Sequence, residues 1–436
     1  MMVLRAVCFG LLVSEIGAIP ALQPYASAPA TAVLPSIAST STATASSQLD
    51  QLASFALIVT TERVSNRTAQ KRDGCTRNKL RVRRDWRTLS DPQRREFIDA
   101  ILCLQQLPSQ TPPDLAPGAK TRYDDFVATH INQTRQIHFT GTFLGWHRYF
   151  VAEFEQALRS ECGYTGDYPY WNWPDDTENL EDSPIFDGSD TSFSGNGAPI
   201  PNQPPEFALT ISGRPPIWLP TGSGGGCITD GPFKNYTLNL GPAGLALPGG
   251  EQASAPNPLD YNPRCLKRDL TSSILRQFSN ATAVVELLLK NRIVYDFQTS
   301  MQGTPGSGGI GVHGGGHYSM GGDPGRDVFT SPGDPAFWVH HGMVDRVWWI
   351  WQSLDWGARW NAISGTGTFL NEPPSPNTTL ETVVDIGFAG SGGPIAMREI
   401  MSTTAGRFAM CIFDFLLFFL SFFLSFFSWG DCCGLG

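Results

Sequence analysis

Apolar residues recur at helical spacing in several stretches of the chain, and residues 143–160 show the clearest pattern. One face of this stretch is formed by residues three or four apart, namely His147, Val151, Phe154 and Leu158. The same period predicts helices in four further stretches: 86–104, 123–131, 271–290 and 334–352. We therefore expect a mainly α-helical protein.

Two of these predicted helices carry recognisable start signals. In the stretch 86–104, Ser90 or Asp91 is suited to the cap position and Pro92 to the first turn. In the stretch 334–352, Asp334 stands at the cap position and Pro335 at the first helical position. We expect the helices to begin at these residues.

Long irregular loops are expected between the helices. The chain of 436 residues contains 45 glycines and 33 prolines, which concentrate in residues 178–270 and 303–316. A chain of this length is sufficient for one large core or for two domains.

The two ends of the chain differ from its body. Residues 1–21 combine a basic start, an apolar run and small residues, which predicts a secretory signal. Residues 22–69 are rich in Ala, Ser, Thr and Pro and predict a flexible leader. Residues 406–436 include the apolar run 415–427, which is shorter than the ~20 residues that a spanning helix needs. This tail is either a removed lipid-anchor signal or, as we favour, a translated non-coding stretch, and only the first would bring the chain to a membrane.

Composition limits the classes of partner. The net charge is −9 and basic residues form no extended stripe, so nucleic acid is not expected as a partner. Acceptor triplets for N-glycosylation are consistent with a secreted, extracellular glycoprotein, and they occur at Asn66, Asn132, Asn235, Asn280 and Asn377.

The nine cysteines predict disulfides rather than a thiolate metal site. Cys227 and Cys265 flank one Gly/Pro-rich excursion and are candidates to close it. The body holds an odd number of cysteines, so one of them either pairs with Cys411 or stays free. No Cys-x-x-Cys pair occurs in the sequence.

The seven histidines fall into two groups. The first group is His130, His138 and His147, and the second is His313, His317, His340 and His341. A single histidine is more often an ordinary hydrogen-bonded residue, but seven in two groups are hard to explain in that way. His313 and His317 would share one helix face, although three intervening glycines each cost about 1 kcal/mol in a helix relative to Ala.

His340 and His341 point about 100° apart on their predicted helix, so we expect one to bind metal and the other to support it. We favour His341 as the ligand because Asp345 shares its face and is positioned to orient the ring. The alternative is that Asp345 pairs with Arg346 or another cation.

Two sets of three imidazoles imply two metal ions, and all-imidazole sites suit copper or zinc. A zinc site of this kind would activate water for hydrolysis. Two facing sites suit a pair of coppers, which together exchange two electrons with O2 and with a substrate.

The segments around these histidines resemble the type 3 copper proteins, which are tyrosinases, catechol oxidases and hemocyanins. The similar stretches are His138-Phe-Thr-Gly-Thr-Phe-Leu-Gly-Trp-His147, Pro169-Tyr-Trp171-Asn-Trp173, His313-x-x-x-His317 and Asp334-Pro-Ala-Phe337-Trp-Val-His340-His341-x-x-x-Asp345. The resemblance covers residues 70–405 and is greatest to the short, secreted fungal polyphenol oxidases.

This resemblance implies a central four-helix bundle that holds a dinuclear copper site. It assigns His130, His138 and His147 to the first copper, and His313, His317 and His341 to the second. It also implies that Phe337 overhangs the second copper and restricts the entrance, with plain core packing as the alternative.

Three departures from the family pattern bear on function. No cysteine lies between His130 and His147, so a thioether to the second histidine is not expected. No C-terminal lid domain is expected after residue 405. Where efficient phenol hydroxylators often carry Asn, this chain has Gly314, and Tyr318 follows the second histidine. Without that Asn, a bound water is less easily poised to deprotonate a monophenol, which favours catechols.

We therefore expect oxidation of small o-diphenols, with monophenols as further candidates, to o-quinones while O2 is reduced to water. One alternative within the same chemistry is an oxidase of o-aminophenols or peptide phenols in secondary metabolism. A reversible oxygen carrier would bind the same coppers without turning over catechol, and a zinc hydrolase would differ in metal content.

Overall fold

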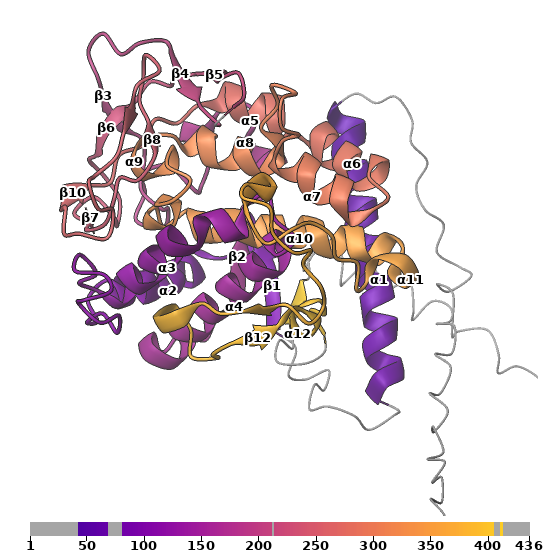
Figure 1. Ribbon diagram of the computed structural model, residues 1–436. Helices are drawn as coiled ribbons and strands as arrows, with labels where there is room; N and C mark the ends of the chain where they lie inside the picture. The colour runs from indigo at the N-terminus through magenta and orange to yellow at the C-terminus, as the bar shows by residue number, and fades with distance from the viewer. Residues whose placement is uncertain (1–41, 69–80, 212, 405–409, 413–436) are drawn as a thin grey trace, which may run out of the picture.

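The computed structural model describes residues 42–68, 81–211, 213–404 and 410–412, and it confirms a mainly helical fold (Figure 1). The longer helices are α1 Thr42–Thr68, α2 Asp91–Leu104, α3 Arg122–Ile137, α4 Phe143–Cys162, α6 Ala281–Lys290, α7 Val294–Gln302, α8 Gly311–Met320 and α10 Phe337–Leu354. The shorter helices are α5 Ser272–Phe278, α9 Gly322–Gly325, α11 Trp356–Arg359 and α12 Met397–Ile400.

Four of these helices meet at the centre of the molecule. Helix α10 packs against α4 and α8, and α3 packs against α4. These helices are amphipathic or wholly buried, and α10 is buried along its full length. They carry or flank all seven histidines, so the bundle brings two distant parts of the sequence together.

The start of α2 agrees with the sequence prediction. Ser90 is the N-cap, and it forms a reciprocal capping box with Gln93, with a proline in the first turn. Residues Trp86–Thr88 form a separate 3-10 turn, so the helix is shorter than predicted. Helix α3 is longer than predicted, because Thr121 and Asp124 cap it one residue earlier and it continues to Ile137.

Helix α10 begins at Phe337, three residues after the cap position predicted at Asp334. The Asp334 carboxylate does accept a hydrogen bond from the Ala336 amide at 2.9 Å. However, it is also paired with Arg268, from which it accepts two hydrogen bonds of 2.7 and 2.8 Å. Residues Ser331–Gly333 form a 3-10 turn just before it, so this long-range ion pair sits at the entry to the helix.

The stretch 271–290, predicted as one helix, is divided into α5 and α6. Asn280 separates them, because its side-chain oxygen accepts a hydrogen bond from the Ala283 amide and caps α6. The break matters for the bundle, since α5 packs closely against α8.

Helix α1 lies within the segment predicted as a flexible leader, and here the structure differs from the prediction. Leu49, Leu52 and Ala56 are buried where α1 packs on α6 and α10. The Trp349 indole donates a hydrogen bond of 3.0 Å to the Thr60 hydroxyl. Small and apolar residues at helical spacing thus gave a packed helix. Residues 1–41 lie outside the described part, as does the tail after residue 412.

Strands are short in this fold. The one three-stranded sheet among the described residues is parallel, in the order β13 Met410–Ile412, β1 Arg81–Asp85 and β2 Tyr168–Tyr170. Two-stranded pairs occupy the Gly/Pro-rich region and the C-terminal part: β3 Gly197–Pro199 with β6 Gly225–Ile228, β4 Glu206–Leu209 with β5 Ile217–Pro220, β7 Thr237–Leu238 with β10 Arg264–Cys265, β8 Leu245–Ala246 with β9 Gln252–Ala253, and β11 Val383–Val384 with β12 Ile395–Ala396.

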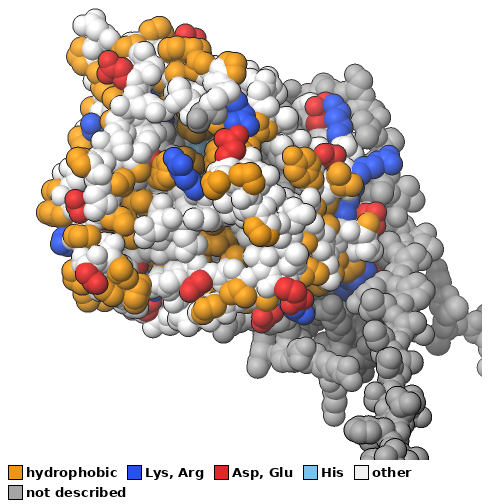
Figure 2. Space-filling view, viewed as in Figure 1, with side chains coloured by type: hydrophobic (Ala, Val, Ile, Leu, Met, Phe, Trp, Pro, Cys, Tyr) orange, Lys and Arg blue, Asp and Glu red, His pale blue; other side chains and the backbone are white. Residues whose placement is uncertain are grey.

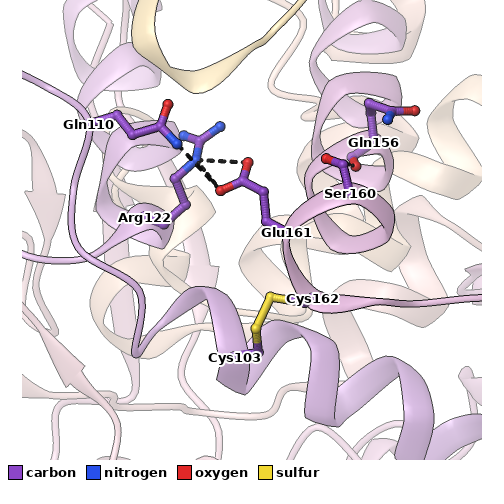
Figure 3. The surroundings of a disulfide bond; sticks show 7 residues. All are labelled: Cys103, Gln110, Arg122, Gln156, Ser160, Glu161 and Cys162. Carbon is purple, nitrogen blue, oxygen red and sulfur yellow. Dashed lines mark hydrogen bonds and ion pairs between the residues drawn. A yellow bond between two sulfur atoms is a disulfide. The ribbon is translucent and has the colours of Figure 1, made fainter.

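Two disulfides brace the fold. The predicted bond between Cys227 and Cys265 is present. A second bond joins Cys103 on α2 to Cys162 at the end of α4, and beside it Arg122 of α3 binds Glu161 of α4 (Figure 3). The helices α2, α3 and α4 are therefore tied together at one end. Among the described helices, none combines the length and hydropathy needed to cross a bilayer.

Candidate metal centre

The first histidine group lies where α3 and α4 meet. His130 is on α3, His138 ends that helix, and His147 lies near the start of α4. Their ring centroids are 5.0 to 5.8 Å apart, and each side chain is at most 3% exposed. One ring nitrogen from each lies within 4.8 Å of the others, which is the arrangement that a shared metal ion needs.

Hydrogen bonds to backbone carbonyls orient all three rings of this group. The Nδ1 atoms of His130, His138 and His147 lie 2.8, 3.0 and 2.8 Å from the carbonyl oxygens of Phe329, Thr134 and Phe143. A carbonyl only accepts, so the proton stands on Nδ1 and Nε2 keeps a free lone pair. The Nε2 atoms of His130 and His147 are buried without a hydrogen-bond partner in the described structure. Such atoms are suited to bind a metal.

The second group lies between α8 and α10. His313, His317, His340 and His341 each offer a nitrogen within the same 4.8 Å limit, and all four are buried. The Nε2 atoms of His317 and His341 are 3.1 Å apart. The Nδ1 atoms of His317 and His341 have no hydrogen-bond partner among the described residues, whereas every Nδ1 atom of the first group has one.

His340 is distinguished from the other three by a tryptophan. The Trp173 indole N–H donates to the His340 Nδ1 at 3.1 Å, and both side chains are fully buried. An indole only donates, so Nδ1 carries no proton and the proton of the neutral ring stands on Nε2. Neither nitrogen of the neutral His340 ring is therefore left with a free lone pair, which separates it from His341.

The glycines between His313 and His317 have a packing role. A Cβ on Gly315 would lie 2.1 Å from the hydroxyl of Ser279, the residue that follows α5, and one on Gly316 would lie 2.3 Å from the His340 ring. The close approach of α8 to its neighbours therefore requires glycine, which offsets the low helix propensity of the segment. Tertiary contacts therefore hold this segment in place.

The two groups face one another. The rings of His147 and His341 stack at 4.6 Å with an interplanar angle of 12°, and those of His138 and His313 are 5.9 Å apart. Rings from both halves of the sequence thus lie against one another within the bundle.

Burial governs the protonation of these rings. Desolvation lowers the pKa of all seven histidines, to about 4 for His138, and neighbouring imidazoles lower most of them further. Neutral imidazoles are the form that ligates a metal.

Phe337, Gly314 and Tyr318 lie on the same two helices, α8 and α10, as the second histidine group. Phe337 is fully buried, with its ring centroid 4.1 Å from His341 and 5.6 Å from His130, so it contacts both groups. Gly314 follows His313 on α8, where an added Cβ would lie 2.9 Å from the Cβ of Ile310. Tyr318 packs toward Phe207 of β4, at 6.2 Å, and burial raises its pKa. The role of Phe337 at the entrance stays a prediction.

Asp345 has partners that the sequence did not indicate. One carboxylate oxygen accepts from Arg83 of β1, and the other accepts from Arg148 of α4 at 2.6 Å. Within the described part of the chain no hydrogen bond joins it to His341. Asp345 therefore anchors α10 to α4 and β1 through two arginines that are distant in the sequence, rather than orienting the histidine ring.

Sequence reasoning missed two contributions to the site. Trp173 was seen only as part of a motif, although its pairing with His340 decides which histidine is free. Arg83 and Arg148 lie far from Asp345 in the sequence, and no local pattern links them. A buried carboxylate on a fully apolar helix face is the signal that would have called for such partners.

The donor set fits two copper ions, because each group supplies neutral, buried imidazoles with free nitrogens and no charged ligand. Residues 120–354 match the family model described as the common central domain of tyrosinase. The chain is 43% identical over 333 residues to Tyrosinase P of Aspergillus terreus, covering 75% of this chain and 90% of the relative. It is 38% identical over 347 residues to an N-acetyl-6-hydroxytryptophan oxidase of Emericella nidulans, with 77% and 92% covered.

A solved structure agrees with these relatives. A variant of the polyphenol oxidase from Thermothelomyces thermophila superimposes with a TM-score of 0.78 at 42% identity, covering 84% of this chain and 98% of that one. Proteins of this kind use a dinuclear copper site. The chain therefore belongs to the tyrosinase family, as a copper-dependent oxidoreductase that acts on phenols with O2.

Proposed function

We propose that this protein oxidises o-diphenols to o-quinones. The observation that carries the proposal is the direct contact between two buried sets of imidazoles from distant parts of the sequence. In the balanced reaction, two diphenols each lose two electrons and two protons, and one O2 becomes two waters.

The proposed ligands of the first copper are His130, His138 and His147. Those of the second are His313, His317 and His341. His340 is excluded because its Nδ1 accepts from Trp173 and the remaining proton of the neutral ring occupies Nε2. When bound, the copper pair supplies the two-electron exchange between substrate and O2.

The residues of the chain supply orientation and exclusion of water. Carbonyl bonds hold the first three rings, so little reorganisation is needed when metal binds. Phe337 places an apolar ring against both groups and is the residue that we propose limits access to the second copper.

Gly314 supports diphenols over monophenols as substrates. The position lacks a polar side chain that could poise a water to take the proton of a monophenol. A larger residue there would also have to displace Ile310. The named relatives include both a tyrosinase and a hydroxytryptophan oxidase, so an aminophenol or a phenolic side chain in secondary metabolism is the second candidate substrate.

We also propose that the protein is secreted. Two disulfides are typical of an oxidising compartment. The acceptor residues Asn132, Asn235 and Asn377 are exposed, whereas Asn280 is engaged in capping α6. The first three are the proposed glycan sites.

Oxygen uptake on catechol, a monophenol and an o-aminophenol tests the proposal, together with metal analysis of the same sample. We expect copper and fastest uptake with catechol. Reversible O2 binding without turnover would indicate a carrier, and zinc without oxidation would indicate a hydrolase. Gly314→Asn should raise the monophenol-to-diphenol rate ratio, whereas the control Gly314→Ala, with the same crowding of Ile310, should not.

A further inference from the structure

The residue after His138 has an unusual backbone. Phe139 has φ +49°, in the left-handed region that a bulky L-residue rarely adopts. Its amide donates to the Gln302 side-chain oxygen at 2.7 Å, and its carbonyl accepts from the Leu370 amide at 3.3 Å. Gln302 is itself fixed, because its amide nitrogen donates to the Gln298 carbonyl at 3.0 Å. The surroundings therefore impose this conformation, and such strain tends to persist where it serves a function.

The ring of Phe139 pairs with a second aromatic ring from a distant loop. Its centroid lies 5.2 Å from that of Phe369, at an interplanar angle of 73°, and both side chains are partly exposed. Phe369 belongs to the 3-10 turn Phe369–Asn371, in which Leu370 and Asn371 also have positive φ. Two segments thus both adopt left-handed backbone where these rings meet.

Phe139 directly follows His138, so this aromatic pair lies next to the proposed copper centre. His313 and His317 are 6 and 7% exposed, and His138 is 3% exposed, whereas His130 and His341 are 0 and 1% exposed. The rings with some exposure thus include His138, to which Phe139 is covalently joined.

Uncharged residues border the pair on the side of Gln302. Gln302 leads into the glycine-rich loop 303–309 and then to Ile310, beside Gly314. The loop that carries Phe369 is drawn in gold in front of α10 in Figure 1. On the same face in Figure 2, hydrophobic and uncharged side chains cover most of the surface, and a few basic and acidic side chains lie among them, some in contact with one another.

We propose that Phe139 and Phe369 form an aromatic wall that determines specificity, binding an apolar or aromatic substituent of the phenol outside the copper pair. The inference rests on the proposed function. An edge-to-face pair leaves ring surface free for a further aromatic contact, which is worth about a 3- to 10-fold change in affinity. The preferred substrates are then catechols with an apolar or aryl extension, rather than small charged ones.

The test compares kcat/KM for catechol and 4-phenylcatechol. Phe139→Gly removes the ring and suits the left-handed backbone, so the unfolding midpoint should stay equal or rise. Phe369→Ala removes the partner ring without changing the residue at 139. In both variants we expect kcat/KM for 4-phenylcatechol, divided by kcat/KM for catechol, to fall about 3- to 10-fold. The value for catechol itself should be nearly unchanged.

Two controls separate specificity from structure. Asn202→Gly replaces another residue with positive φ, exposed and outside the site, and should leave the ratio unchanged. In copper-free wild-type protein, 4-phenylphenol should raise the unfolding midpoint more than phenol does. This difference between the two ligands should be smaller in Phe139→Gly and in Phe369→Ala.

The proposal of an aromatic wall is wrong if the ratio of the two kcat/KM values stays within twofold of wild type. It is also wrong if kcat/KM falls equally for both catechols. If Phe139→Gly does not fold, Phe369→Ala alone decides. Failure of the wild-type protein to oxidise catechol would instead reject the proposed function, so the two failures are distinguishable.

Discussion

The two histidine groups are held in different ways. In the first group, every Nδ1 is hydrogen-bonded to a backbone carbonyl, either of the helix that carries the ring or, for His130, of Phe329, so backbone groups orient the rings. In the second, His317 and His341 have buried Nδ1 atoms without a described partner, and their rings are placed by contacts with Phe337 and neighbouring imidazoles. The first histidine group is therefore preorganised by hydrogen bonds, and the second histidine group by packing.

This difference predicts where the centre is vulnerable. A hydrogen-bonded ring tolerates small changes around it, whereas a packed ring moves when its neighbours change volume. We therefore expect the second copper to be lost more easily than the first when packing is perturbed.

The largest effect is expected from removing a ligand. His138→Ala or His341→Ala should each lower the copper content from two equivalents toward one and reduce catechol oxidation more than about 100-fold, since even supporting groups cost up to that much. The matched control is His340→Gln, which should keep two equivalents. If the control lost copper as the His341 variant does, the ligand assignment would be wrong.

Overpacking should distinguish the two halves. Gly316→Ala places a Cβ 2.3 Å from the His340 ring, a rigid neighbour, and should cost about 1–3 kcal/mol with preferential loss of the second copper. Gly145→Ala, on α4 of the first group, meets only the flexible end of Met397 at 2.5 Å. Thermal unfolding and copper titration of both variants check the prediction, and equal effects would contradict it.

Acid should destabilise the copper-free protein. Burial lowers the pKa of the histidines in the folded state, to about 4 for His138, while unfolded histidine titrates near 6.5. The unfolded state therefore takes up protons first, and stability is lost as pH falls from about 6.5 toward 4. Urea unfolding across this range should show the decline, and a flat profile would show that the rings are not buried without metal.

The smallest effect is expected from Trp173→Phe. It leaves the buried Nδ1 of His340 without its donor, at a cost of about 1–3 kcal/mol, and frees that ring to change its proton position. Copper content should stay near two, with weaker binding at the second position only. Equal weakening at both positions would argue against separate support of the two groups.

Much of this centre was predictable because its signals are local. The spacing of His147 with its apolar neighbours defines α4, and the capping residues around Ser90 define α2. The grouping of the histidines and their motifs indicated two facing metal sites, and Cys227 with Cys265 flanked a loop that they do close.

The features that were missed depend on partners distant in the sequence. Asp334 is paired with Arg268 at the entry to α10, and Asp345 binds Arg83 and Arg148. Helix α1 was obscured by its many Ser, Thr and Ala residues, which lower its apparent amphipathicity although small residues suit close packing. The ion-pair partners and the packing of α1 depend on tertiary contacts, which local sequence patterns do not show.

The most direct test of the central claim is the copper state of the purified, copper-loaded protein. Metal analysis should give two equivalents per chain, and the oxidised protein should have almost no electron paramagnetic resonance signal, because two adjacent Cu(II) ions couple. A single equivalent, or two equivalents with full signal intensity, would contradict a shared site built by the two histidine groups.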